Sequence, residues 1–287
     1  MTEDDSKHRD DCRLRFELLQ SVSLNGSVGK PNDDITATTR SLAWVIDGAT
    51  DLGPPGLFGT QGGAAWLAGA TSAAFTASDA PTMKATCEAA FQRVERQFQR
   101  ERRRDVEEAW ELPKAAFAAA RLTGDALEVA WAADCSALHA SSESATWCTG
   151  APDSRTEAAE AAALGDGIGA DALRAGPVLE DRRKHRGQPD HSALSPHAGA
   201  SALATQFATY HVTASDDVFL MSDGFTRLVT DFGVYCADTL VDAIRTRGLA
   251  ALVTELRQIE QADEGCLRYP RFKVSDDATA LWLRIAD

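Results

Sequence analysis

Two continuous apolar runs in this sequence each end at an Asp-Gly pair. Leu42–Ile46 stops at Asp47-Gly48, and the run inside DVFLMSDGF stops just before Asp223-Gly224. A short apolar run that is rich in β-branched and aromatic residues and ends at turn residues predicts a buried strand. The chain must therefore fold so that two buried strands each deliver an acid at their carboxyl ends.

The rest of the chain alternates strand patterns with helix patterns. The first of these runs lies in an expected strand at residues 35–48. Further strands are expected at residues 16–24, 114–122, 126–141, 208–213 and 275–285. Helices are expected at residues 64–76, 81–111, 156–163, 235–247 and 249–262. The sequence contains no internal repeat and no stretch long enough for a linker. This order predicts an α+β fold in one domain, residues 16–287, after a polar tail at residues 1–15.

Composition limits the possible partners. Of 287 residues, 44% are hydrophobic and 25% are charged, as in ordinary globular proteins, and the net charge is −14. This negative charge disfavours binding to nucleic acid or to an anionic membrane surface. The acidic N-terminus has no apolar segment typical of a secretory signal, so we expect a cytoplasmic protein. The six cysteines are scattered without zinc-ligand spacing, which favours inert packing roles.

Further aspartates fall next to the ends of predicted strands. Asp134 ends the second arm of a predicted hairpin, Asp276-Asp277 open the last strand, and Asp33-Asp34 precede an early one. Strand ends in a packed sheet converge on one rim, where clustered like charges are costly unless a cation lies among them. Oxygen ligands at this density suit Mg²⁺ or Mn²⁺ rather than zinc. A glycine after an acid lets backbone approach the ion, or turn sharply, without a Cβ clash.

Four segments resemble, in order, the motifs of a known family. WVIDGAT, LEVAWAADCSAL, VFLMSDGF and SDDATALWL are similar to segments of the metal-dependent protein phosphatases, also called type 2C or PPM Ser/Thr phosphatases. The resemblance covers roughly residues 16–285, and SDGF with DDAT carries most of it. It implies a bacterial-type single-domain member with a β-sandwich of two mainly antiparallel sheets flanked by helices. It also implies hydrolysis of phosphoserine and phosphothreonine in a phosphorylated protein substrate.

The resemblance further implies a centre with two Mn²⁺ or Mg²⁺ ions. Asp47 would bridge both ions, the carbonyl of Gly48 would bind one of them, and Asp223 and Asp276 would bind the other. Asp134 would serve a third, looser ion. Two ions held a few ångströms apart acidify a water molecule and stabilise both the attacking and the leaving oxygen.

The catalytic set implied by the resemblance departs from the family pattern. Asp33 and Asp34 would hold metal-bound waters, although Glu is usual at the first of these positions. Lys30 is the nearest cation for the substrate phosphate, where an Arg is common, and no His follows the first Asp-Gly pair. The basic run at residues 182–186 is expected to be solvated surface, with a place beside the active site as the other reading.

Two other readings were weighed. A haloacid-dehalogenase-like phosphatase needs an acid two residues before a second one, but Met221 stands two before Asp223, so this reading is rejected. A catalytically weak or inactive phosphatase-like domain that binds a phosphoprotein stays open, because the His is missing and the phosphate cation is a Lys.

Overall fold

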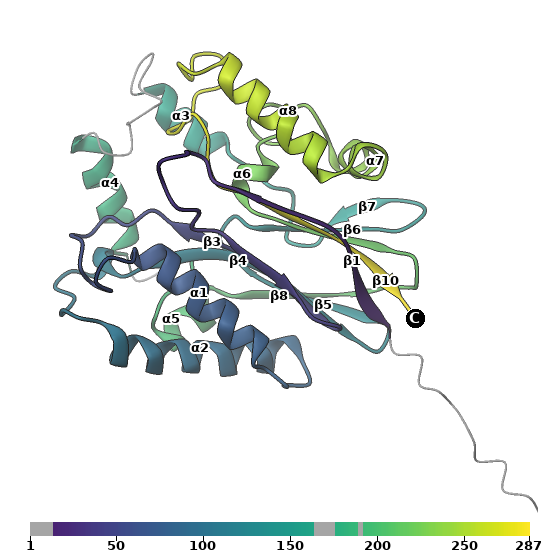
Figure 1. The fold of residues 1–287 in the computed structure, drawn as a ribbon, viewed down its shortest axis with the longest axis horizontal. Coiled ribbons are helices and arrows are strands. Elements are labelled where there is room, and N and C mark those ends of the chain that lie inside the picture. The colour runs from purple at the N-terminus through teal and green to yellow at the C-terminus, as the bar shows by residue number, and fades with distance from the viewer. Residues whose placement is uncertain (1–13, 164–175, 189–191) are drawn as a thin grey trace, which may run out of the picture.

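The computed structural model describes residues 14–163, 176–188 and 192–287. In this part of the chain, strands form two five-stranded sheets, and every strand pairing is antiparallel (Figure 1). One sheet has the order β1 (Arg15–Leu24), β10 (Ala278–Ala286), β9 (Asp217–Met221), β6 (Ser136–Ala140), β7 (Ala145–Trp147). The other has the order β2 (Ile35–Thr38), β3 (Leu42–Ala49), β4 (Lys114–Thr123), β5 (Ala126–Ala132), β8 (Gln206–His211).

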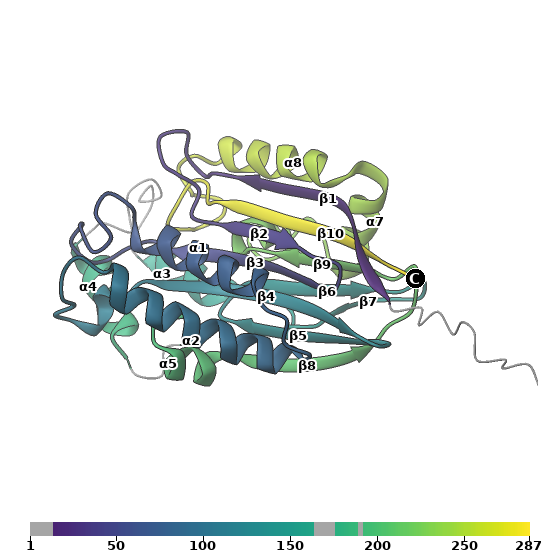
Figure 2. The same ribbon diagram turned by 60° about the horizontal axis from the view of Figure 1, so that its bottom comes forward.

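Helices cover the outer faces of this sandwich (Figure 2). The sheet containing β3 is covered by α1 (Gly63–Thr76) and α2 (Met83–Glu101), with α5 (Ala198–Ala204) against α2. The sheet containing β10 is covered by α7 (Ala237–Arg247) and α8 (Leu249–Ala262). At one end of the sandwich lie α3 (Arg155–Ala163) and α4 (Gly176–Arg186), while the short α6 (Asp223–Thr226) follows β9 directly. The predicted β-sandwich flanked by helices is confirmed.

The side-chain alternation of β3 explains its continuous apolar run. Leu42, Trp44 and Ile46 pack in the core beneath the helices, whereas Ala43 and Val45 pack in the core between the two sheets. Both faces of the strand are therefore covered, and successive side chains point to opposite faces. A strand buried on both sides cannot show the hydrophobic-polar alternation of a half-exposed one.

The predicted helix at residues 81–111 is wrong in its second half. Helix α2 ends at Glu101, and a single 3₁₀ turn, η1 (Ala109–Glu111), precedes β4. The residues between them form hydrogen bonds with the loop after β3. The N–H of Arg103 donates to the carbonyl of Leu57, and the Arg104 guanidinium donates to the carbonyl of Pro54. These tertiary hydrogen bonds replace the helical ones that the sequence pattern predicts.

The predicted tail can be compared with the structure only at its end. Strand β1 starts at Arg15, and residues 1–13 lie outside the described residues, so the tail stays a prediction. Among the helices of the described residues, none has both the length and the apolar character to cross a membrane.

Candidate active site

Strand registers bring three of the predicted acids to one end of the sandwich. In one sheet, Met221 at the end of β9 pairs with Ser136 at the start of β6 and with Ala280 near the start of β10. The residues just beyond these positions are Asp223, Asp134 and the Asp276-Asp277 pair. Their charges influence one another, as their mutual effects on pKa show.

The second sheet adds two more acids at the same place. Ile35 of β2 pairs with Ile46 of β3, which puts Asp34 beside Asp47. Among the neighbouring charges that raise the pKa of Asp47, that of Asp34 has the largest effect and that of Asp223 the next largest. The acids of both sheets therefore form one group, which we call the acid cluster: Asp33, Asp34, Asp47, Asp134, Asp223 and Asp276.

Asp134 reaches this cluster through a break in a predicted strand. The second arm of the hairpin was expected to run through residues 126–141, but it divides into β5 and β6, which belong to different sheets. Ala133 has a positive φ of 61°, a left-handed conformation that reverses the chain between the two strands. Asp134 follows it and lies exposed at this turn.

Asp34 is the most informative member of the acid cluster. Its residue is only 6% exposed, and neither of its carboxylate oxygens has a hydrogen-bond partner among the described residues. Oδ1 of Asp223 is likewise buried and unpartnered. A buried carboxylate without a partner is costly, and a bound cation or a proton would offset that cost.

Burial and mutual repulsion change the pKa values of the cluster. Burial raises the pKa of Asp34 to about 7, against the effect of the Thr279 and Ser222 hydroxyls, which lie nearby without forming a hydrogen bond to it. Burial and the charge of Asp277 raise the pKa of Asp33 to about 6. Desolvation raises the pKa of Asp47 well above its usual value. It also raises the pKa of Asp134 to about 7, although that residue keeps exposed surface.

Asp223 responds to several neighbours at once. Burial and the charge of Asp276 raise its pKa, while the guanidinium of Arg227 and the carboxyl group of Asp47 oppose this rise.

The glycines after the two acids permit close contacts with the chain's own backbone. A Cβ on Gly224 would lie 1.9 Å from the carbonyl oxygen of Asp277, and one on Gly48 would lie 2.9 Å from that of Asp33. Both close approaches are to backbone atoms of the chain itself. It joins the Asp-Gly turns to the two other acid-bearing segments of the site.

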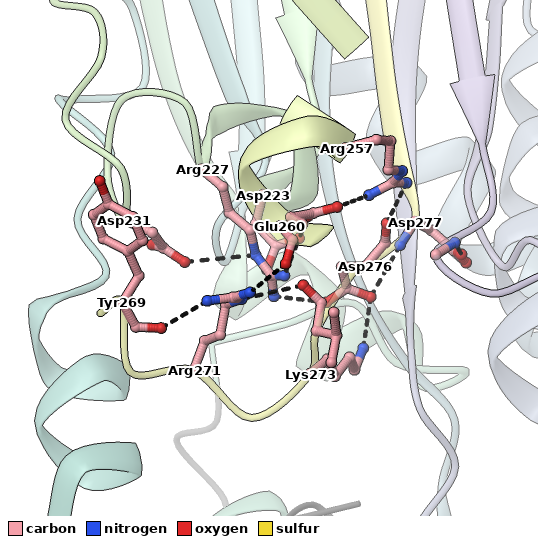
Figure 3. A network of polar contacts seen from close by, with 12 residues as sticks. Asp223, Arg227, Asp231, Arg257, Glu260, Tyr269, Arg271, Lys273, Asp276 and Asp277 are labelled. Atoms are coloured by element: carbon pink, nitrogen blue, oxygen red, sulfur yellow. Dashed lines mark hydrogen bonds and ion pairs between the residues drawn. The ribbon is translucent and has the colours of Figure 1, made fainter. Parts of the chain in front are cut away.

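Asp276 differs from the other acids because cations already pair with it (Figure 3). Its Oδ1 accepts a hydrogen bond from Nζ of Lys273 at 2.6 Å, and its Oδ2 accepts one from Nη2 of Arg227 at 3.2 Å. Burial alone would raise the pKa of Asp276, but Lys273 and Arg227 hold it below its usual value. Sequence reasoning missed both cations, although Lys273 stands only three residues before Asp276.

The structure does not bring Lys30 into contact with the acid cluster. Its side chain is exposed and forms no ion pair within the described ranges, and its backbone N–H donates to Ser27. Lys273, rather than Lys30, is the cation that lowers the pKa of Asp33.

Two arginines of the basic run 182–186 differ from the solvated surface that we expected. The guanidinium of Arg183 donates to the carbonyl of Leu52 and lies over the ring of Trp110, and Arg186 donates to the carbonyl of Thr50. These contacts tie α4 to the loop after β3. Part of the run is therefore structural.

A cavity of about 510 Å³ opens beside the acid cluster. Asp134 and Asp223 line it from the sheet ends, Glu157 from α3, and Arg182 and His185 from α4. Burial and the charge of Asp223 raise the pKa of Glu157, which places this side chain close to the cluster. The cavity is large enough to admit a side chain of a protein substrate.

The carboxylate oxygens of the acid cluster are the kind of ligand that a hard divalent cation prefers. Asp34 and Asp223 offer buried, unpartnered oxygens, and a cation would relieve the repulsion that raises the pKa values of the group. In the described residues, however, no three Asp, Glu, His or Cys side chains already converge on one point as a finished metal site. The fit thus rests on the unpartnered oxygens.

Solved structures with a similar fold are bacterial serine/threonine phosphatases. The catalytic domain of the serine/threonine protein phosphatase PstP, in complex with two manganese ions, is 17% identical over 96% of this chain and 99% of that chain, with a TM-score of 0.56. The Mycobacterium tuberculosis serine/threonine phosphatase PstP/Ppp is 16% identical over 96% of this chain and 100% of that chain, with a TM-score of 0.57. The fold is that of the PPM phosphatases.

A further structure with a similar fold is PppA, a regulatory component of the T6SS in Pseudomonas aeruginosa, at 16% identity, 95% and 98% coverage and a TM-score of 0.51. No family model and no curated protein matches the sequence. The structural similarity covers nearly all of this chain and of those structures.

Proposed function

We propose that this chain is a member of the PPM family and a metal-dependent phosphomonoester hydrolase that acts on phosphoserine or phosphothreonine in proteins. The observation that carries the proposal is Asp34, a buried carboxylate with two unpartnered oxygens inside a group of acids at strand ends. The PPM fold supports it, because the solved structures that share this fold are serine/threonine phosphatases.

The cation would be Mn²⁺ or Mg²⁺, held by oxygens of the acid cluster. Asp34 and Asp223 are the proposed ligands with unpartnered oxygens, and Asp47, the Gly48 carbonyl and Asp134 are further candidates. When bound, such a cation would acidify a water molecule and offset the negative charge that develops on the phosphoryl oxygens. The residues of the chain would orient the substrate in the neighbouring cavity and exclude bulk water.

Asp33 and Lys30 remain proposed contributors from the loop at residues 25–34. Asp33, whose pKa is raised to about 6, would hold water near the cluster and exchange a proton with it close to neutral pH. Lys30 would bind the substrate phosphate from the exposed rim as a point charge. Lys30→Ala should then raise KM severalfold with little change in kcat, because the phosphate charge is present in both the ground state and the transition state.

The test is hydrolysis of p-nitrophenyl phosphate and of a phosphothreonine peptide. Activity should require Mn²⁺ or Mg²⁺ and disappear with EDTA. Asp34→Asn should lower kcat/KM by more than about 100-fold, while Asp79→Asn, at an exposed position away from the cluster, should stay within about twofold. Equal turnover in EDTA would overturn the proposal.

The second candidate function is a phosphatase-like domain with little or no activity that binds a phosphoprotein. One observation favours it: Asp276, a residue expected to bind metal, is already paired with Lys273 and Arg227. A protein that binds the phosphopeptide at micromolar concentration but does not hydrolyse it with either metal would fit this alternative.

A further inference from the structure

The carboxylate of Asp276 has its hydrogen-bonding capacity largely occupied by groups of the chain. Oδ1 accepts from Nζ of Lys273 at 2.6 Å and from the backbone N–H of Asp277 at 3.0 Å, and Oδ2 accepts from Nη2 of Arg227 at 3.2 Å. Its backbone carbonyl accepts from Arg257 at 2.7 Å. Figure 3 shows these donors converging on Asp276 from α8, from the segment after α6 and from the loop before β10. A carboxylate paired with two cations has little left to offer a metal ion.

Arg227 is fixed in this position by a buried network. Its side chain is 6% exposed, and its guanidinium also lies 3.6 Å from Asp231 and 3.8 Å from Glu260. Arg257 in turn holds Glu260 at 2.6 Å. Removing a partner from such a network would leave a buried charge uncompensated, so Arg227 and Asp276 stay together.

Lys273 is the freer of the two cations. Its side chain is 33% exposed, and within the described residues its ion pair is with Asp276. An ammonium group has three N–H donors, and one of them is used on Asp276. The charges of Asp223 and Asp47 also act on Lys273 and, with that of Asp276, raise its pKa against the effect of burial.

The acids of the cluster thus divide into two classes. Asp276 forms ion pairs with two cationic side chains of the protein, whereas Asp34 and Asp223 together carry three buried oxygens without a partner. Building on the function proposed above, we propose that Lys273 is a resident cation of the site in place of a second metal ion. The site then takes one divalent cation, held by the unpartnered oxygens of Asp34 and Asp223, and the ammonium of Lys273 faces the phosphoryl group of the substrate.

The number of bound ions tests this proposal without any measurement of activity. The EDTA-treated and dialysed protein is titrated with Mn²⁺ in a calorimeter, and bound metal is counted by mass spectrometry after gel filtration. Wild type should bind about one ion per chain. Lys273→Met keeps the length of the side chain but removes its charge, so Asp276 becomes available and about two ions should bind. The first of them should bind on the order of tenfold more tightly.

Two matched variants separate charge from shape. Lys273→Arg keeps the positive charge and should still bind about one ion. Lys84→Met removes an exposed lysine of α2 and should also bind about one. Thermal unfolding followed by circular dichroism checks that each variant is folded. If Lys273→Met failed to fold, the wild-type count would still test the proposal, because two ions bound by wild type would overturn it.

Each outcome has a defined meaning. Two ions bound by wild type, or one ion bound by folded Lys273→Met, would overturn the role of Lys273 and leave the proposed hydrolase standing. No Mn²⁺ bound by wild type would overturn the metal-dependent function itself. One ion bound by wild type and two by Lys273→Met would support the assignment.

Discussion

Oδ2 of Asp277 accepts a hydrogen bond from the backbone N–H of Asp33 at 2.8 Å, although 244 positions separate them in the chain. Its Oδ1 accepts a second bond from the N–H of Gly26 at 2.7 Å. One carboxylate at the start of β10 therefore holds both ends of the loop that carries Lys30, Asp33 and Asp34. The position of this loop depends on the last strand of the protein.

Asp277→Asn tests this relationship. An amide keeps one acceptor oxygen and replaces the other with a donor, so one of the two N–H groups loses its partner. The cost should be about 1–3 kcal/mol, and the Tm should fall by about 2–4 °C per kcal/mol. Thermal unfolding measures the loss, with Asp79→Asn as the exposed control. A Tm equal to that of wild type would mean that the loop does not need Asp277.

Metal should stabilise the fold through the acid cluster. Mn²⁺ at about 100 times its Kd should add roughly 2.7 kcal/mol to the free energy of unfolding. Without metal, Asp47→Asn should melt higher than wild type, because it removes one of several mutually repelling charges. With Mn²⁺ the variant should gain much less than wild type. Asp79→Asn should behave as wild type in both conditions, and a wild-type Tm that ignores Mn²⁺ would contradict a metal site.

The raised pKa values predict how stability changes with pH. Asp33, Asp34 and Asp134 have folded pKa values of about 6, 7 and 7, against about 3.9 for an unfolded Asp. Between these values the folded state binds more protons than the unfolded state. The contribution of the three groups is therefore fully present below about pH 4 and is lost as pH rises through 6 to 7.

In EDTA, the Tm should accordingly be lower at pH 8 than at pH 6. Mn²⁺ should reverse this order, since protons compete with the metal for the same oxygens and the metal therefore stabilises more at pH 8. Calorimetry at the two pH values, with and without Mn²⁺, measures both effects. Asp34→Asn should flatten the dependence seen in EDTA. A Tm that rises from pH 6 to pH 8 in EDTA would show that other groups dominate.

Gly224→Ala should be severely destabilising. Its Cβ would lie 1.9 Å from the carbonyl oxygen of Asp277, so the backbone of one acid-bearing segment would have to move. We expect a loss of more than about 3 kcal/mol and, in whatever folds, a weaker response of Tm to Mn²⁺. Gly29→Ala, in the loop before Asp33, has no atom within 4 Å of the new Cβ and should change stability by less than about 0.5 kcal/mol.

The sequence by itself determined the two buried strands and their acids. The run Leu42–Ile46 predicted β3 because both faces of that strand are covered, and SDGF and DDAT predicted acids at the ends of β9 and β10. A continuous apolar run predicts such a strand because a strand that is buried on both faces has apolar residues at every position. The α+β class followed from the order of these elements, and the sandwich from the resemblance to the PPM phosphatases.

Only the tertiary structure decided which charges meet. Lys273 and Arg227 pair with Asp276, Asp277 holds the loop of Asp33, and Lys30 stays exposed. Helix α2 likewise ends at Glu101 because the following residues bond to a distant loop. An isolated Lys or Arg carries no periodicity that marks its partner, and an ion pair depends on distances between segments far apart in the chain. Those distances are set when the two sheets pack, which no local pattern of residues records.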